Sequence, residues 1–149
     1  MSPTKTRLAV FDDLLAMLAL YRHLNADDPV PSDEAARSAW RELLSQTNSK
    51  VLVMEANGEI AATCTVTIIP SLTRGARPYA IIENVVTLPE YRKTGLGSAI
   101  VKAAIDAAWA ANCYKISLTT GSRRESTLRF YEKLGFQKNG RTLFDMRRV

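Results

Sequence analysis

The sequence contains a single histidine, His23, and only two cysteines, Cys64 and Cys113. One histidine makes a zinc site or a histidine-dependent nucleophile unfavourable, and the two cysteines lie outside metal-ligand spacing. No apolar run is long enough to cross a membrane, and the N-terminus lacks a basic segment followed by an apolar stretch. We therefore expect a cytoplasmic protein with reduced thiols, no metal and no membrane partner.

The chain is short and its charge is unevenly distributed. At 149 residues and 46% hydrophobic composition, it fits one domain that spans residues 1–149. The net charge is +5, yet the part from Cys113 onward carries nine Lys or Arg and only three Asp or Glu. Such a basic region suits nucleic acid or one polyphosphate ligand, and a plain solvated face is the third alternative. No basic helix with interleaved aromatic residues favours nucleic acid, so we expect no nucleic-acid partner.

Hydrophobic periodicity predicts six strands and four helices. The expected strands are Arg7–Val10, Lys50–Ala56, Glu59–Pro70, Tyr79–Thr87, Tyr114–Thr119 and Thr142–Arg148. The expected helices begin at Asp12 or Asp13, Ser32, Gly97 and Glu125 and end near His23, Ser45, Ala111 and Leu134. Asn57-Gly58 joins two strand runs and is a strong hairpin signal. This order predicts an α/β (α+β) fold with a mixed central sheet and helices on both faces.

Several positions within these elements have an expected role in packing or capping. Gly135 suits the C-terminal cap of the last helix, and the helical spacing of Trp109 makes it a packing residue first. The segment Ser71–Pro78 is expected to be an exposed loop beside the ligand site that the next segment predicts. The first helix is expected to bury Leu14, Leu15, Leu18 and Tyr21.

The most informative segment is the basic, glycine-spaced turn Arg92-Lys93-Thr94-Gly95-Leu96-Gly97, which follows a strand and opens a helix. Its glycines let the main chain approach a ligand, and the amides of a helix start favour a bound anion. An ordinary loop before an amphipathic helix is the alternative interpretation. No lysine and hydroxyl pair follows Gly97, which excludes a Walker loop, and the position past mid-chain excludes a dinucleotide fingerprint.

This turn and one further block resemble the GCN5-related N-acetyltransferase (GNAT) superfamily. Its acetyl-CoA signature, Gln/Arg-x-x-Gly-x-Gly/Ala, is matched by Arg92–Gly97, and its Phe-Tyr-Glu-Lys-Leu-Gly-Phe block stands at Phe130–Phe136. The segments 82–86, 112–116 and 146–147 give a weaker likeness to glucosamine-6-phosphate N-acetyltransferases. The resemblance implies the GNAT fold (acyl-CoA N-acyltransferase) with a largely antiparallel sheet. It also implies acetyl-CoA as the acetyl donor and a homodimer.

The resemblance also assigns the contacts of acetyl-CoA. The strand at Val85, Val86 and Thr87 would splay from its neighbour and offer main-chain groups to the pantetheine arm and the thioester carbonyl. Polarising that carbonyl would stabilise the charge that develops on its oxygen. The residues that would hold the pyrophosphate are Arg92, Lys93, Thr94, Gly95, Leu96, Gly97 and Ser98.

Glu83 and Tyr131 are the candidates for the two proton transfers. Glu83 interrupts an apolar strand before the expected thioester site, where a carboxylate can accept a proton or bind the ammonium of the substrate. Its alternative role is that of a solvent-facing strand residue. The Tyr131 phenol can donate a hydrogen bond to the leaving sulfur, or the ring can pack beside Phe130.

Five arginines keep more than one interpretation each. Arg123, Arg124 and Arg129 either contact the 3′-phosphate of CoA or coat a helix. Arg74 and Arg77 either meet an anionic acceptor or a partner subunit, or lie solvated on their loop.

These observations predict an acetyl-CoA-dependent N-acetyltransferase that acts on a primary amine of a small molecule by direct attack in a ternary complex. An amino sugar or its phosphate is one such acceptor. The alternatives are a protein lysine or N-terminal acetyltransferase and, in another class, a non-catalytic CoA- or nucleic-acid-binding module.

Overall fold

The computed structural model describes residues 3–138 and 140–148. The chain forms two compact units, one that extends to Thr119 and one that starts at Thr120. The first unit contains a sheet with the strand order β1-β2-β3-β4-β5. In its described residues, the second unit contains helix α5 (Glu125–Lys133).

The sheet is mixed and largely antiparallel, as expected. Its strands are β1 (Lys5–Leu8), β2 (Ser49–Ala56), β3 (Glu59–Ile69), β4 (Tyr79–Thr87) and β5 (Ile116–Ser117). The first four pair antiparallel, and β5 pairs parallel to β4. Asn57 and Gly58 form the two-residue hairpin between β2 and β3, both with positive φ (52° and 81°), as a type I′ turn requires.

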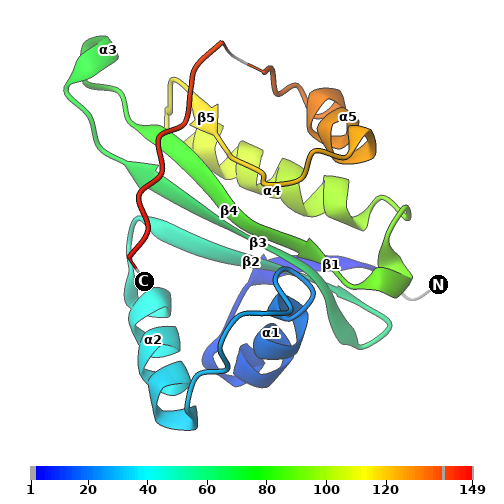
Figure 1. The fold of residues 1–149 in the computed structure, drawn as a ribbon. Coiled ribbons are helices and arrows are strands. Elements are labelled where there is room, and N and C mark those ends of the chain that lie inside the picture. The colour runs from blue at the N-terminus through cyan, green and yellow to red at the C-terminus, as the bar shows by residue number, and fades with distance from the viewer. Residues whose placement is uncertain (1–2, 139, 149) are drawn as a thin grey trace. The chain divides into compact units, whose positions relative to one another are not determined.

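Helices cover both faces of the sheet (Figure 1). The helical elements of the first unit are η1 (Phe11–Asp13), α1 (Leu14–Tyr21), α2 (Asp33–Ser45), α3 (Thr73–Ala76), η2 (Pro89–Tyr91) and α4 (Leu96–Ala110). Figure 1 shows α1 and α2 on one face and α4 on the other. Ser32 caps α2, since its hydroxyl accepts a hydrogen bond from the amide of Ala35 at 3.2 Å.

The face below α1 and α2 holds one core cluster. Met17, Leu20 and Trp40 pack there with Val51 and Val53 of β2. Each such side chain contributes about 1.5 to 3 kcal/mol when it is fully buried. The cluster fixes the position of α1, whose C-terminal end reaches β3 and β4.

On the opposite face, α4 packs through small and branched residues. Ile100, Val101 and Ala104 are fully buried, and the Cys64 thiol of β3 donates to the main-chain oxygen of Ile100 at 3.5 Å. Burial raises the pKa of Cys64 to about 12, so the thiol stays protonated. Trp109 is 52% exposed, and its expected packing role is wrong. It follows Ala108 by one residue, and about 100° of helix turn carries it away from the sheet.

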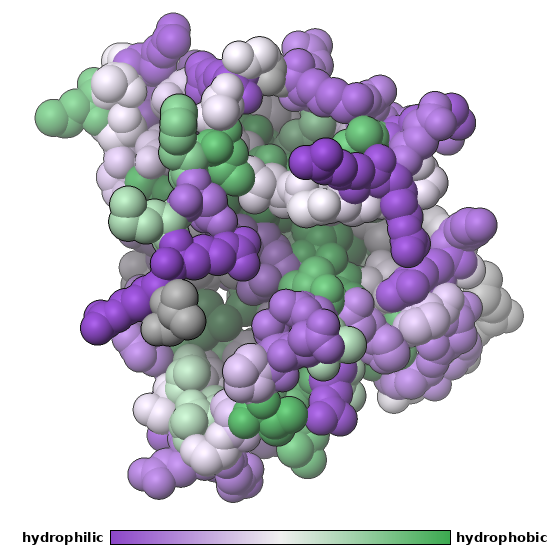
Figure 2. All heavy atoms as spheres, in the orientation of Figure 1, coloured by the Kyte–Doolittle hydropathy of each residue, from purple (hydrophilic) through white to green (hydrophobic). Residues whose placement is uncertain are grey.

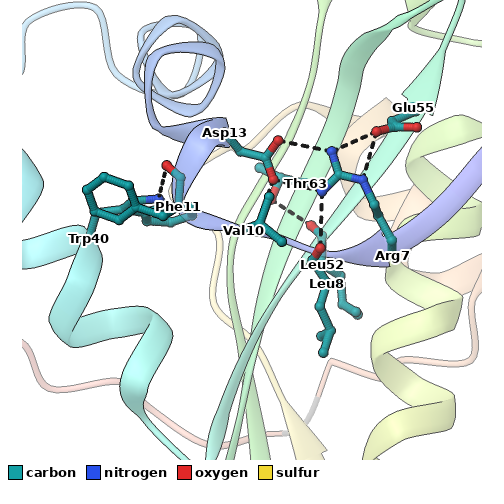
Figure 3. A network of polar contacts seen from close by, with 9 residues as sticks. All are labelled: Arg7, Leu8, Val10, Phe11, Asp13, Trp40, Leu52, Glu55 and Thr63. Carbon is teal, nitrogen blue, oxygen red and sulfur yellow. Dashed lines mark hydrogen bonds and ion pairs between the residues drawn. The ribbon is translucent and has the colours of Figure 1, made fainter.

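A charged network joins β1, β2 and η1 (Figure 3). Arg7 donates from Nη1 and Nη2 to the two carboxylate oxygens of Asp13, at 2.7 and 2.9 Å, and from Nε to Glu55 at 2.7 Å. The amide of Val10 donates to the same Asp13 carboxylate at 2.8 Å. These hydrogen bonds, led by that from Arg7, hold the pKa of Asp13 below its usual value. The network ties the edge strand β1 to β2 and to η1.

Two expected strands differ in the structure. Residues 141–148 form no strand, so the expected strand Thr142–Arg148 is wrong. A strand needs a ladder partner, and the described residues of the second unit supply none. The expected strand Tyr114–Thr119 is reduced to β5, which, within the part of the chain that the structure describes, pairs with Ala80 and Ile81 alone.

Two details near the N-terminus also differ. The first strand lies two residues earlier than Arg7–Val10, because Val10 instead begins the turn into η1. Leu15 is 77% exposed, whereas Met17 and Leu20 take the buried positions of α1.

Hydrophilic residues cover much of the face shown in Figure 2, with apolar residues in patches between them. In the first unit, Leu72 and Val30 are largely exposed on loops. Isolated apolar residues of this kind are normal on a protein surface. They therefore do not mark a site.

Candidate active site

The turn between β4 and α4 has the geometry of an anion site. Lys93 and Gly95 have φ of 61° and 90°, and α4 begins at Leu96, one residue before the expected start. Left-handed residues within such a turn point successive amides toward one concave side, a form that binds anions. A glycine suits the left-handed position of Gly95, whereas Lys93 adopts it at a cost in backbone strain.

The amides of this turn are available to a ligand. From Lys93 to Ser98, no main-chain amide donates to an oxygen of the described residues, and the first helical bond is Ala99 to Gly95 at 3.0 Å. Unpaired amides at the start of a 15-residue helix also carry the positive end of its dipole. The turn can therefore bind a phosphate group.

Tyr91 holds the turn against the β2–β3 hairpin. Its hydroxyl donates to Glu59 at 2.8 Å and accepts from the side-chain Nδ2 of Asn57 at 3.2 Å, and the hydrogen bond to Glu59 raises the pKa of the phenol. The Thr94 hydroxyl donates to the main-chain oxygen of Tyr91. Sequence reasoning missed Tyr91, because its partners lie more than 30 residues away.

The side chains of Arg92 and Lys93 differ in their contacts. The Nε atom of Arg92 donates to the main-chain oxygen of Thr87 at 3.2 Å, so this arginine ties the turn to the end of β4. Lys93 is exposed and adds positive charge beside the amides.

A bulge interrupts β4 where the sequence predicts the thioester. Thr63 pairs with Val86 and Thr65 pairs with Glu83, so Asn84 and Val85 together lie opposite one residue of β3. Asn84 has φ of 54°. A bulge of this kind leaves a residue outside the ladder and bends the strand.

The other edge of β4 is open beside the bulge. Among the described residues, β5 pairs with β4 only at Ala80 and Ile81. Val85 and Thr87 are half-buried and Val86 is buried. The main-chain groups of this segment on that edge can meet a ligand, with the exception of the Thr87 oxygen that Arg92 occupies.

Glu83 lies just before the bulge and its side chain is exposed. Its partner Thr65 is 8% exposed, and the Thr65 hydroxyl has no hydrogen-bond partner among the described residues. Thr65 also pairs with Val51, which belongs to the core cluster under α1 and α2. The side chain of Thr65 therefore points to that face of the sheet. The hydroxyl of Tyr21, at the end of α1, lies close to the hydroxyls of Thr65 and Thr63 but forms no hydrogen bond of ordinary geometry with Thr65. Sequence reasoning gave no site role to Tyr21 or Thr65, although the alternation of threonines in β3 was a signal.

Tyr131 belongs to the second unit. It lies on α5 and makes edge-on contacts with Phe130 and Phe136, at ring-centroid distances of 5.0 and 6.1 Å. Gly135 has φ of 99° and ends this helix as expected. The packing contact is thus present, and the role of the phenol as proton donor stays a prediction.

The five arginines with open roles lie in two places. Arg77 donates to the main-chain oxygens of Asn112 and Cys113 at 3.3 and 3.1 Å, and Arg74 lies over the Tyr114 ring at 5.8 Å. These contacts hold the loop before β4 within its own unit. In the second unit, Arg123, Arg124 and Arg129 are exposed, and Arg129 pairs with Glu125.

Comparison with known proteins identifies the family. The sequence profile of the Acetyltransferase (GNAT) family matches residues 17–136. The chain is 34% identical to the glucosamine 6-phosphate N-acetyltransferase of Trypanosoma brucei brucei over 131 residues, which cover 88% of this chain and 87% of that protein. The chain therefore belongs to the GNAT family and is an N-acetyltransferase.

Solved structures agree in fold. A putative acetyltransferase from Agrobacterium tumefaciens is 42% identical, with a TM-score of 0.92 over 97% of this chain and 99% of that chain. The glucosamine-6-phosphate N-acetyltransferase of Arabidopsis thaliana is 25% identical, with a TM-score of 0.85 over 97% and 99%. No helix within residues 3–138 and 140–148 has the length and apolar character needed to span a membrane.

Proposed function

We propose that the chain transfers the acetyl group of acetyl-CoA to a primary amine of a small molecule, by direct attack in a ternary complex. The observation that carries the proposal is the juxtaposition of two features in one segment. The unpaired amides at Lys93–Ser98 suit the pyrophosphate of CoA, and the bulge at Asn84 lies only a few residues earlier. In this assignment acetyl-CoA, the acetyl donor, lies along the open edge of β4.

In the reaction, the amine nitrogen attacks the thioester carbon. The acceptor ammonium first loses one proton to a base, which leaves a neutral amine. As that nitrogen attacks, a carbon–nitrogen bond forms, the carbon–sulfur bond breaks, and a second proton from the nitrogen balances the proton that the leaving thiolate gains. A neutral amine is a good nucleophile, so alignment is the main contribution required of the protein. Main-chain groups at Val85, Val86 and Thr87 orient the thioester carbonyl and stabilise its developing charge.

Two side chains would manage the protons. Glu83 receives the ammonium of the acceptor and accepts its proton directly or through water. Its exposure before the bulge supports this role, because the carboxylate is open to a ligand. Tyr131 donates a hydrogen bond to the leaving sulfur. The match of its surrounding block to the family motif supports that assignment.

An amino sugar or its phosphate is the first acceptor to test. The support is the 34% identity to a glucosamine 6-phosphate N-acetyltransferase. We further propose that residues 1–149 act as one catalytic domain, since the family match spans both units. A homodimer in the cytoplasm is proposed as well, and Phe144 and Met146, which are 91% and 98% exposed, are apolar surface that a second copy would cover.

The test measures thiol release from acetyl-CoA across a panel of amines that includes glucosamine, glucosamine 6-phosphate, a lysine peptide and an α-amino peptide. We expect turnover with a small amine and none with the peptides. Faster turnover with either peptide would favour a protein acetyltransferase. No turnover with any acceptor, together with salt-sensitive DNA binding, would favour a binding module.

A further inference from the structure

The hydroxyl of Thr65 is an unusual feature of the β3–β4 region. It is buried, and among the described residues it has no hydrogen-bond partner. Neighbouring threonines on the same strand face differ in this respect. Thr63 donates to the main-chain oxygen of Leu52 at 2.7 Å, and Thr67 shares a hydrogen bond with Ser49 at 2.9 Å. A buried polar group without a partner is rare and calls for an explanation.

Its position points to the acceptor side of the site. Thr65 lies directly opposite Glu83 in the β3–β4 ladder, immediately before the bulge. Side chains of directly opposed residues start about 4.5 to 5.5 Å apart at their Cβ atoms. A group near Thr65 and a group near Glu83 can therefore contact neighbouring atoms of one small molecule.

The side chain of Tyr21 approaches this hydroxyl from α1. Its ring is half-buried against the core cluster at the end of α1, a helix that lies against β3 and β4. Burial raises the pKa of the phenol, while the hydroxyls of Thr65 and Thr63 act on it in the opposite direction. The phenol thus stays protonated at neutral pH and lies beside Thr65.

We propose that the Tyr21 phenol, positioned by Thr65, hydrogen-bonds a hydroxyl of the acceptor that is adjacent to the amine received by Glu83. The proposal rests on the proposed function and specifies its substrate as a vicinal amino alcohol. Tyr21 touches the substrate and determines specificity. Thr65 is sealed from solvent, acts through Tyr21 and is a positioning residue.

The experiment compares trans-2-aminocyclohexanol with cyclohexylamine, which share a ring and an amine and differ by one adjacent hydroxyl. In the wild type we expect a higher kcat/KM for the amino alcohol. Tyr21→Phe and Thr65→Val should lower the ratio of the kcat/KM for the amino alcohol to that for cyclohexylamine about three- to tenfold, the effect of one hydrogen bond. Thr65→Ser, which keeps the hydroxyl, should restore the preference.

Thr67→Val is the matched control. It makes the same chemical change on the same strand and face, but its hydroxyl already has a partner in Ser49. This variant should keep the wild-type preference for the amino alcohol. A merely structural role for Thr65 would lower the rates with both amines together.

Two outcomes separate the inference from the proposed function. Turnover of both amines without preference for the hydroxyl, or loss of preference in Thr67→Val equal to that in Thr65→Val, would overturn the role of Tyr21 and Thr65 alone. Failure of every amine in the wider panel would overturn the proposed function, and this inference with it.

Discussion

Gly95→Glu gives the most direct test of the phosphate site, because the chain offers a matched control in Gly58→Glu. Both glycines have positive φ, 90° and 81°, and a Cβ atom at either one meets no other atom within 4 Å. Each substitution therefore places a side chain in a left-handed conformation, at a cost of about 1 to 2 kcal/mol. Both variants lower the net charge equally, so they differ only in where the carboxylate lies.

The difference in CoA affinity follows from local electrostatics. A carboxylate at Gly95 would lie about 6 Å from a phosphate held by the turn, where two like charges cost about 3 kcal/mol at an effective dielectric constant near 20. This corresponds to about a hundredfold loss of affinity. Gly58 lies on the β2–β3 hairpin, and CoA should bind that variant nearly as well as the wild type.

The assay is calorimetric titration with CoA, with thermal unfolding measured in parallel. Both variants should lose about 2 to 8 °C in Tm, which shows that the backbone strain is comparable. Equal CoA affinity in Gly95→Glu and Gly58→Glu would refute the assignment of the turn as the pyrophosphate site.

Three further predictions concern single side chains. Tyr131→Phe keeps the aromatic packing and should lower kcat about a hundredfold in a thiol-release assay with unchanged CoA affinity; wild-type turnover would exclude the proton donor. Asp13→Asn removes one of the two carboxylates that pair with Arg7, since Glu55 remains, and should cost about 1.5 to 3 kcal/mol of unfolding free energy at neutral pH. Because the folded pKa of Asp13 lies below 3.8, this stabilisation is present above that pH and is lost as the pH falls through the lower folded value, so the two proteins should converge in acid denaturation. Thr63→Val removes the hydrogen bond to the main-chain oxygen of Leu52 and should lower Tm more than Thr65→Val, whose hydroxyl makes no such bond; an equal fall in both would show that the Thr65 hydroxyl is fully satisfied.

Elements with strong local signals could be predicted from the sequence. The bounds of β4 agree residue for residue, because a run rich in β-branched and aromatic residues there is bounded by Pro78 and Pro89. The hairpin at Asn57-Gly58 is confirmed for the same reason, since both residues tolerate positive φ. Such features depend on nearby residues alone.

The wrong predictions concern segments whose structure is decided by tertiary contacts. The helix α1 is apolar around its whole circumference, so its sequence does not reveal that Met17 and not Leu15 faces the core. The segment 142–148 has residues with strand propensity, but propensity forms no strand without a partner. Both outcomes depend on what lies beside the segment.

The same distinction between local signals and tertiary contacts applies to the candidate site. Gly95 and the amides after it could be predicted, because an anion site at a helix start is a local motif. The support from Tyr91 and the pair Tyr21 and Thr65 could not, since α1, β3 and η2 come together only in the folded chain. Sequence therefore indicated the local geometry of the proposed acetyl-CoA side better than that of the proposed acceptor side.

This division has a physical consequence for how specificity can change. The ladder to β3 is regular on both sides of the bulge, at Ile82 and at Val86, so the bulge cannot slide along β4. One covalent segment thus fixes the separation between the thioester position and the phosphate turn. The acceptor side depends instead on side chains from α1 and β3, which can be exchanged without shifting that segment. Acceptor preference can consequently change by substitutions at Tyr21 or Thr65 while the geometry of acetyl-CoA binding is kept.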